Sequence, residues 1–151
     1  MKNIMYALLI IAALVSAAPA NIITHGIGLR FGSATEVIYQ EYPGPDNRIE
    51  VGLGGGVGWF FGLTVTYKWN WKITDDLSWY AGPCGQFRVL IETANGYGIG
   101  GQAGIEYDLN AIHWPFVLSL DTRPVVGLRE KGETADVGLN VDLGLSVRYA
   151  F

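Results

Sequence analysis

The sequence predicts an all-β protein, an eight-stranded antiparallel transmembrane β-barrel preceded by a cleaved signal peptide. Three observations favour this fold class. The chain begins with a short apolar run, it is rich in glycine and aromatic residues, and its last eleven residues alternate strictly between apolar side chains and polar or small ones. Such alternation gives a strand one face suited to an apolar environment and one suited to a polar environment.

Residues 1–20 have the features of a secretory signal peptide. Lys2 precedes an apolar run over residues 4–15, and Ala18-Pro19-Ala20 provides an A-x-A cleavage site. A membrane anchor needs about 20 apolar residues, which is more than this run contains. We therefore expect export through the Sec pathway and one mature domain, residues 21–151. That domain has no further long apolar run, so it could reside in a membrane only as a barrel.

The composition narrows the class of this domain. Residues 1–20 contain one charged residue, Lys2, which leaves nine basic and 14 acidic residues and a net charge of −5. Nucleic-acid binders need a basic face, so this balance weighs against them. The 21 glycines and the aromatic content of 13% are typical of many short strands and turns. The single cysteine, Cys84, cannot form an internal disulfide and is expected to be a buried thiol.

Eight alternating segments follow, separated by turn residues. They cover residues 23–31, 35–42, 48–54, 60–71, 77–90, 97–109, 116–126 and 141–151. The first, third and fourth segments each have one apolar face. Its members are Ile27, Leu29 and Phe31; Ile49, Val51 and Leu53; and Phe61, Leu63, Val65, Tyr67, Trp69 and Trp71. The second segment is ambiguous, because Val37 and Tyr39 compete with Ile38 and Tyr42 for the same face.

The later segments have the same pattern. Their outward residues are Trp79, Ala81, Phe87 and Val89; Ile99, Ala103, Ile105 and Tyr107; Phe116, Leu118 and Leu120; and the odd-numbered residues from Val141 to Phe151. Pro83 lacks the backbone N–H that a paired strand needs, which predicts a bulge in the fifth strand. Gly32-Ser33 and residues 43–47 predict turns, and residues 127–136 predict the longest loop at the cell surface.

The strand lengths fit a bilayer. Ten steps separate Phe61 from Trp71, and at about 3.4 Å per residue and a tilt near 40° they rise roughly 25 Å. With both termini in the periplasm, an aromatic girdle forms at that rim. Its predicted members are Trp69, Trp71, Trp79, Tyr107, Trp114, Tyr149 and Phe151, with Trp59, Phe60 and Tyr97 near the outer rim. A soluble, lipocalin-like secreted barrel is the structural alternative.

Three segments resemble those of a known family. Trp79-Tyr-Ala-Gly-Pro83, residues 118–124 and residues 145–151 are similar to small outer-membrane barrels of the OmpX and OmpA transmembrane-domain type, and closer still to an uncharacterised group of small barrels. The resemblance implies a place in the bacterial outer membrane, in contact with its lipid. It also implies that Tyr149 and Phe151 form an assembly signal, read by the barrel-assembly machinery through the C-terminal strand.

The chain departs from this family in one respect. OmpX-type members raise long extracellular strands or loops, whereas the connections at Gly32-Ser33 and near residues 56–59 are short. This departure argues against adhesion by protruding loops.

The inward faces of the predicted strands carry a charge network. Its members are Arg30, Glu50, Lys68, Arg88, Glu106, Asp121, Arg123, Asp142 and Arg148, with Arg48 on the same face. An isolated buried charge is very costly, so these groups must pair. Counted from the periplasmic end, Glu50 falls opposite Lys68, and Arg30, Arg123 and Asp142 meet where the barrel closes. We expect a polar, closed lumen, since eight strands leave an interior that side chains fill.

A narrow pore or a small-molecule site in the same lumen is the competing hypothesis. Inward glycines could open space for a ligand, although relief of crowding beside arginine and tyrosine is the expected role. These glycines are Gly26, Gly28, Gly52, Gly54, Gly62, Gly100 and Gly104.

A lipid-modifying enzyme is a further alternative, since some small barrels use histidine with serine and an acid at the outer-leaflet end. Here both histidines, His25 and His113, are expected at the periplasmic end, while Ser33 and Thr35 fall at the outer end without a histidine. The G-x-G-x-x-G match at residues 96–101 precedes a strand rather than the helix that a dinucleotide fold requires. We expect no catalysis, no cofactor and no metal, and a structural or surface-interaction role.

Overall fold

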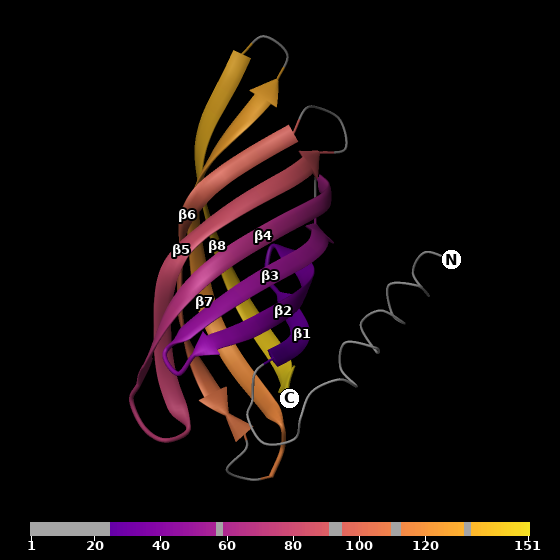
Figure 1. The fold of residues 1–151 in the computed structure, drawn as a ribbon. Helices are drawn as coiled ribbons and strands as arrows, with labels where there is room; N and C mark the ends of the chain where they lie inside the picture. Colours follow the sequence, from indigo (N-terminus) through magenta and orange to yellow (C-terminus); the bar gives the residue numbers. More distant parts are fainter. Residues whose placement is uncertain (1–24, 57–58, 91–94, 110–112, 132–133) are drawn as a thin grey trace, which may run out of the picture.

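The computed structural model describes residues 25–56, 59–90, 95–109, 113–131 and 134–151. They form eight antiparallel strands, and each strand pairs with the next in chain order until β8 returns to β1 and closes the barrel (Figure 1). The strands are β1 His25–Phe31, β2 Ala34–Gly44, β3 Asn47–Gly56, β4 Trp59–Lys72, β5 Leu77–Leu90, β6 Asn95–Asp108, β7 Phe116–Lys131 and β8 Thr134–Ala150. The predicted count of eight strands and the closed antiparallel barrel are confirmed. None of the described residues belongs to a helix long and apolar enough to cross a membrane.

The two ends of the barrel differ in what they carry. β1 begins and β8 ends at one end, where His25 and Phe151 exchange two backbone hydrogen bonds of 3.1 and 3.0 Å. We call this end the terminal rim. The opposite end, the far rim, holds the tight β1–β2 turn at Gly32-Ser33, as predicted.

Alternation along the strands turns polar side chains inward and apolar side chains outward. Among the described residues, 17 of the buried side chains are polar or charged and only seven are hydrophobic, the reverse of a soluble core. The outer wall is apolar, and its side chains stay exposed, from Leu29 of β1 to Leu143 of β8. The outward residues predicted for the first, fourth, seventh and eighth strands are confirmed in this way.

The pairing register fixes the slant of the strands. Gly28 is linked by successive register partners to Gly138, through one residue of every strand from β1 to β8. Gly28 also pairs directly with Arg148, ten residues further along β8. One circuit of the barrel thus shifts the register by ten residues. A shift of this size tilts the strands by roughly 40° to the barrel axis.

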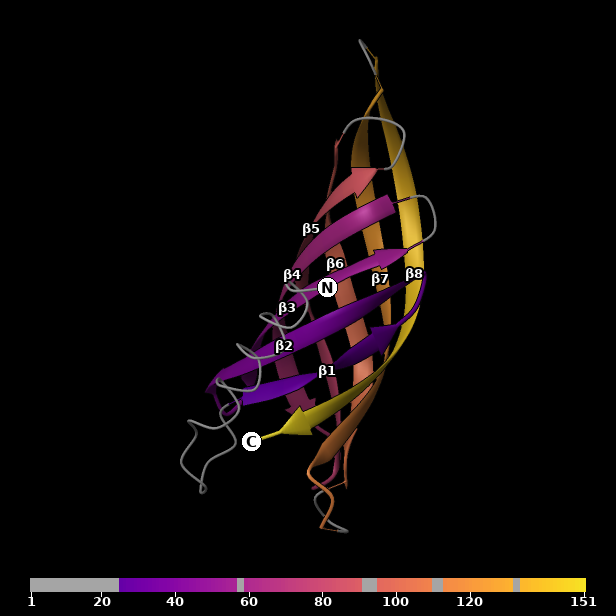
Figure 2. The same cartoon turned by 90° about the vertical axis from the view of Figure 1, so that its right-hand side faces the viewer.

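The height of the wall changes around the barrel. β1 contains seven residues, whereas β7 and β8 contain 16 and 17. Figures 1 and 2 show the rim rising from the β1–β2 turn to the β7–β8 hairpin, which projects beyond all other strands. The predicted loop at residues 127–136 is therefore wrong, because the β7–β8 ladder continues to Lys131↔Thr134. The short turn at Gly32-Ser33 therefore lies on the same rim as one long hairpin.

Two other predictions about strands are resolved. In β2, Ile38 is fully buried in the interior between Glu36 and Gln40, so Val37 lies on the outer wall. In β5, the predicted bulge at Pro83 is absent. The register with β6 runs without a shift through Pro83↔Gly101, and the ladder with β4 skips Pro83 but resumes in the same register. The missing donor thus interrupts pairing with one neighbour without displacing the strand.

Several inward glycines are required by the close approach of a neighbouring strand. At Gly100, a Cβ atom would lie 2.7 Å from the backbone Cα of Val125. Gly28 and Gly54 meet the next strand in the same way. This differs from the predicted role of relieving crowding beside long side chains. The predicted role does apply to Gly144, where a Cβ would overlap the guanidinium of Arg30.

Candidate functional site

The buried charges divide into two clusters stacked along the barrel. The far-rim cluster consists of Arg30, Glu36, Asp121, Arg123 and Asp142, and the terminal-rim cluster of Glu50, Lys68, Glu106 and Arg148. All nine side chains lie on inward positions of their strands, and all are buried. They come from every strand except β5, so the clusters link most of the wall through its interior.

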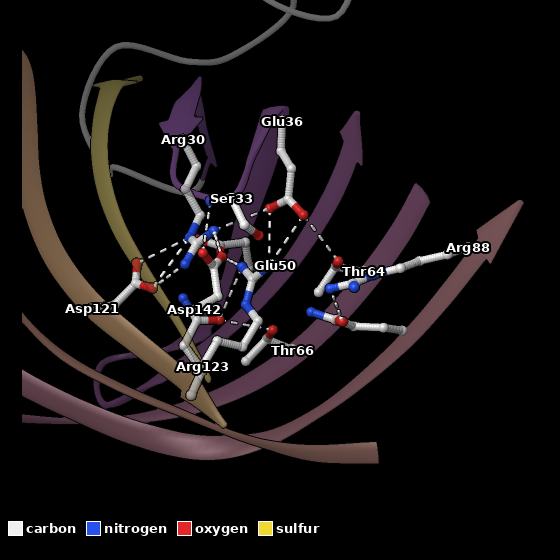
Figure 3. A network of polar contacts seen from close by, with 12 residues as sticks. Arg30, Ser33, Glu36, Glu50, Thr64, Thr66, Arg88, Asp121, Arg123 and Asp142 are labelled. Carbon is white, nitrogen blue, oxygen red and sulfur yellow. Dashed lines mark hydrogen bonds and ion pairs between the residues drawn. The ribbon is translucent and has the colours of Figure 1, made fainter. Parts of the chain in front are cut away.

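Arg30 organises the far-rim cluster, as Figure 3 shows. Its Nη2 donates to Oδ1 of Asp121 and its Nη1 to Oδ2 of Asp142, both at 2.7 Å. The other oxygen of Asp142 accepts a 2.7 Å hydrogen bond from the backbone N–H of Ser33, in the β1–β2 turn. Arg30 thus connects β1 with β7 and β8, and Asp142 holds the turn that follows β1.

Arg123 forms the second half of this cluster. Its Nη1 donates to both carboxylate oxygens of Glu36, at 2.9 and 3.1 Å (Figure 3). Thr64 donates to the same carboxylate at 3.2 Å. Arg123 also approaches Glu50 at 3.8 Å, which is the contact between the two clusters.

In the terminal-rim cluster, one carboxylate oxygen of Glu50 receives two cations. Lys68 Nζ lies 2.5 Å from it and Nη1 of Arg148 lies 3.1 Å from it. Arg148 also pairs with Glu106 at 2.5 Å, and Asn70 donates to the second oxygen of Glu106 at 2.8 Å. Short, charge-assisted bonds of this kind are the strongest that side chains form.

Tyr80 lies between the two clusters. Its ring accepts the ammonium of Lys68 at 4.4 Å from the ring centre, and its hydroxyl lies 3.4 Å from Asp121. The side chain is fully buried. It therefore fills the lumen at the level where the clusters meet.

The two pairings expected from the sequence have different outcomes. Glu50 and Lys68 are paired as predicted. Of the predicted trio, Arg30 and Asp142 pair, but Arg123 pairs with Glu36 instead. Arg123 and Asp142 are register partners on β7 and β8. Arg123 nevertheless forms ion pairs across the barrel, with Glu36 of β2 and Glu50 of β3.

Glu36 and Gln40 are the interior residues that the sequence did not reveal. Both belong to β2, whose faces could not be assigned because Ile38 lies between them on the polar side. The available signal was the unbalanced charge of Arg123. Gln40 is fully buried, and neither atom of its amide has a hydrogen-bond partner in the described part of the chain. Buried amides of this kind usually bind internal water, so we expect a hydrated space beside Gln40.

A cavity lies at each end of the stacked clusters. The one at the terminal rim has a volume of about 550 Å³ and is lined by Tyr42, Arg48, Glu106 and other residues. The one toward the far rim has about 300 Å³ and is lined in part by Gln86, Arg88 and Asn140. The two cavities share no lining residue. Arg88 lines the cavity toward the far rim, where it donates a 2.7 Å hydrogen bond to Gln86, and Arg48 lines the cavity at the terminal rim.

The terminal rim gathers aromatic side chains. Trp71 and Trp79 stack with ring centres 4.3 Å apart, and Tyr149 stacks with Phe151 at 6.0 Å. Trp79, Tyr107 and Trp114 are exposed on the outer wall. These positions form a ring of the kind found at membrane interfaces. Trp59 and Phe60, expected at the other rim, lie outside the residues whose side chains are described, whereas Tyr97 is exposed there.

The described residues offer no further reactive cluster. His25 lies at the terminal rim with its Nδ1 2.7 Å from the hydroxyl of Tyr39, and His113 lies in the turn before β7. Both histidines are thus distant from Ser33 along β1 and β7. No group of three histidine, cysteine, aspartate or glutamate side chains among the described residues could hold a metal ion. Cys84 faces inward and is buried, as predicted.

Comparison with known proteins identifies the fold alone. No protein-family model matches the chain, and no curated protein matches it. Among solved structures, the solution NMR structure of the de novo designed TMB2.3, a small transmembrane β-barrel, superposes with a TM-score of 0.55. The two chains are 14% identical, and the match covers 85% of this chain and 94% of the designed one. The chain is therefore an all-β, closed eight-stranded antiparallel barrel with the architecture of a membrane-spanning barrel.

Proposed function

We propose that the protein is an integral outer-membrane barrel with a closed, polar lumen, and that it acts as a structural or surface-interaction protein without catalysis. The observation that carries this proposal is the inversion of the wall. Apolar side chains cover the outside, and paired charges fill the inside. An outward apolar face about 25 Å tall, bounded by aromatic residues, suits a bilayer and would be a liability in water.

The stacked clusters support a closed lumen. Every charged member has an opposite charge within 4.0 Å, and Tyr80 fills the level between the clusters. Removing such a group exposes its partner as an unpaired buried charge, so the clusters resist opening. An ion would have to displace both layers in order to pass.

The β7–β8 hairpin supports the interaction role. With the terminal rim in the periplasm, this hairpin projects at the cell surface (Figures 1 and 2). It offers a paired backbone and exposed side chains such as Val137 and Leu139. Barrel-assembly machinery is the second proposed partner, through the C-terminal strand and its Tyr149 and Phe151.

Two measurements test this proposal. Purified mature protein should show a detergent-dependent difference in gel mobility between unboiled and boiled samples, and it should give no steady conductance in planar bilayers. A variant that removes one ion pair from each cluster, Glu36→Ser with Arg123→Ser and Glu50→Ser with Lys68→Ser, should raise conductance, which shows that the assay detects opening. A compact fold without detergent would favour the secreted barrel, and steady conductance of the unmodified protein would favour the pore.

The lipid-modifying alternative is tested in the same preparation. The protein is incubated with vesicles of outer-membrane lipids, and the acyl chains are analysed by mass spectrometry. We expect no change in the lipids. Hydrolysis or transfer of an acyl chain, lost on replacement of Ser33, would establish an enzyme instead.

A further inference from the structure

The wall is interrupted where β8 meets β1. Register pairing between these strands ends at Phe31↔Leu145, while β8 continues for eleven more residues to Thr134. Beyond Leu145 the β1 side of β8 therefore has no register partner among the described residues. We call the region above the Gly32-Ser33 turn and beside this edge of β8 the notch.

The notch lies at membrane depth if the barrel spans a bilayer. Heights along the barrel axis can be counted on β8, since each residue rises about 2.6 Å along the axis at a tilt near 40°. From Tyr149 in the aromatic ring, ten residues lead to Leu139, a rise of roughly 26 Å, which is the height of the apolar band. The β1–β2 turn lies beside Leu143, whose carbonyl oxygen lies 2.8 Å from a Cβ built on Gly32. Leu143 is about 10 Å below Leu139, and the register step from β8 to β1 rises about 3 Å, so the turn ends about 7 Å below Leu139.

Backbone groups lie open along this notch. The outward side chains of β8 here are strongly apolar and exposed, with Leu143 at 71% and Val141 at 59%. The same residues leave an unpaired strand edge, which hydrocarbon cannot satisfy. Thinning a bilayer locally costs little per ångström, whereas each dry backbone group costs far more.

The cavity toward the far rim opens at the same level. Asn140 occupies an inward position and lines this cavity, yet it is exposed. Asp142, two residues lower on the same face and level with the end of the turn, is only 7% exposed. The difference arises because no strand stands beside β8 above the turn. Through Gly138 and Asn140 the cavity lies beside the same stretch of β8, and Gln86 is a further polar residue of its lining.

From these observations, and on the proposed location in a membrane, we infer that the notch is a site for the polar headgroups of outer-leaflet lipids. The headgroups and their water descend about 7 Å to the β1–β2 turn, where they hydrogen-bond to the free edge of β8. The outer leaflet is therefore indented on the β1–β2 side and of full thickness beside β4 to β7. The protein would act on the membrane as a local thinning element.

A second copy of the chain does not suit the notch. Two barrels inserted in the same direction are related by an axis along the membrane normal, so both β8 strands descend toward the terminal rim. Their tilts are then opposite, and the two edges cross instead of pairing. Lipid headgroups have no such constraint.

Cysteine labelling tests the inference. In a Cys84→Ser background, Ser33→Cys places a thiol in the notch, and Ile99→Cys places one on the lipid-facing wall. Ile99 is two register steps from Leu139 and about 6 Å below it, which is nearly the depth of Ser33. Both side chains are exposed, Ile99 at 77%. The proteins are refolded into dioleoylphosphatidylcholine vesicles, and a membrane-impermeant maleimide is supplied on both sides.

We expect Ser33→Cys to react at least tenfold faster than Ile99→Cys. Equal protection of both thiols in the folded protein would overturn the notch but leave the membrane barrel intact. Rapid reaction of Ile99→Cys would instead refute the proposed membrane location. Thr35→Cys, on the outer face of β2 just after the turn, serves if Ser33→Cys does not fold.

A quenching experiment identifies the occupant. A fluorophore is attached at Ser33→Cys, and the vesicles carry a small fraction of lipid with a spin label on its headgroup. We expect quenching at least as strong as for a fluorophore at Leu139→Cys, because headgroups reach both. Quenching by aqueous iodide without quenching by the labelled headgroup would mean that water alone fills the notch and would overturn the lipid site.

Discussion

β8 pairs very unequally with its two neighbours. Its ladder with β7 contains 16 register pairs, whereas its ladder with β1, which closes the barrel, contains six. The short ladder is the one that side chains reinforce. Arg30 crosses it to reach Asp142, and Asp142 in turn binds the backbone of Ser33. Across the long ladder, the rings of Phe116 and Tyr149 lie 5.7 Å apart, beside 16 pairs of backbone partners.

This contrast indicates how the barrel is closed. A ladder of six pairs has few backbone bonds to lose, so the side-chain contacts across it form a larger share of its free energy. Arg30 also holds Asp121 on β7, which ties the closing strand to the second strand beyond it. Arg30 thus adds side-chain contacts to the shortest ladder of the barrel.

Replacing Arg30 should have the largest effect on stability. Arg30→Met leaves Asp121 and Asp142 as buried carboxylates without this partner, and should lower the free energy of unfolding by about 3–5 kcal/mol. Urea titration of the protein in detergent micelles or vesicles measures the change. Arg48→Met is the matched control, because Arg48 donates hydrogen bonds to backbone carbonyl groups at the terminal rim. A loss at Arg30 no greater than that at Arg48 would refute the importance of the closing contact.

A charge placed on the outer wall should cost more stability in the part of β8 that pairs with β1 than in the projecting hairpin. Leu145→Arg lies about 10 Å from the aromatic ring and should cost about 2–4 kcal/mol, since it sets a charge against lipid. Val137→Arg lies above Leu139, near the interface, and should cost about 0–1 kcal/mol. Urea titration in vesicles gives both values. Equal costs would show that the apolar band does not end near Leu139, as the residue count along β8 predicts.

Adding one methyl group to β8 compares the part that pairs with β1 and the part that pairs with β7 alone, through a smaller change in stability. Gly144→Ala directs its Cβ into the guanidinium of Arg30 and should cost about 1–3 kcal/mol by crowding. Gly138→Ala, six residues away on the part of β8 that pairs with β7 alone, meets no atom within 4 Å and should change stability by less than about 0.5 kcal/mol. The comparison fails if both variants unfold at the same urea concentration.

Deletion of Phe151 should have the smallest effect on the folded barrel. Its ring lies at the terminal rim against Tyr149 and His25, and its backbone contributes two hydrogen bonds. We expect the deletion to reduce insertion in cells several-fold while the refolded protein loses only about 1 kcal/mol of stability. Membrane fractionation and urea titration measure the two effects. Normal insertion of the shortened chain would argue against the assembly signal.

The fold could be predicted from the sequence where one face is uniformly apolar. β4 from Phe61 onward and the end of β8 alternate without exception, so their faces followed directly. β2 could not be assigned because an aliphatic residue, Ile38, lies inside among polar groups. Periodicity depends on a contrast in polarity between the two faces of a strand, and Ile38 reduces that contrast in β2.

The candidate site was predictable only where both partners lay on clearly assigned strands. Glu50 and Lys68 are on β3 and β4, so their pairing followed from depth alone. Arg123 pairs with Glu36 across the lumen, and β2 had to be oriented before that partner could be found. The β7–β8 hairpin was missed because the glycine and charged residues near its tip have the composition of a loop, although the backbone ladder persists. Composition does not record such pairing.

The seam between β1 and β8 also determines when the molecule can be completed. Its pairs join residues more than 110 positions apart, such as Phe31 and Leu145, while every other ladder joins neighbours in the chain. Seven of the eight ladders can therefore form as the polypeptide emerges, but the ring waits for the last segment to be made. Until then the first and seventh strands both present open edges that invite pairing with other chains. A chain that ends before Leu145 lacks every register partner of β1 on β8 and would thus yield an aggregation-prone sheet instead of a slightly weaker barrel.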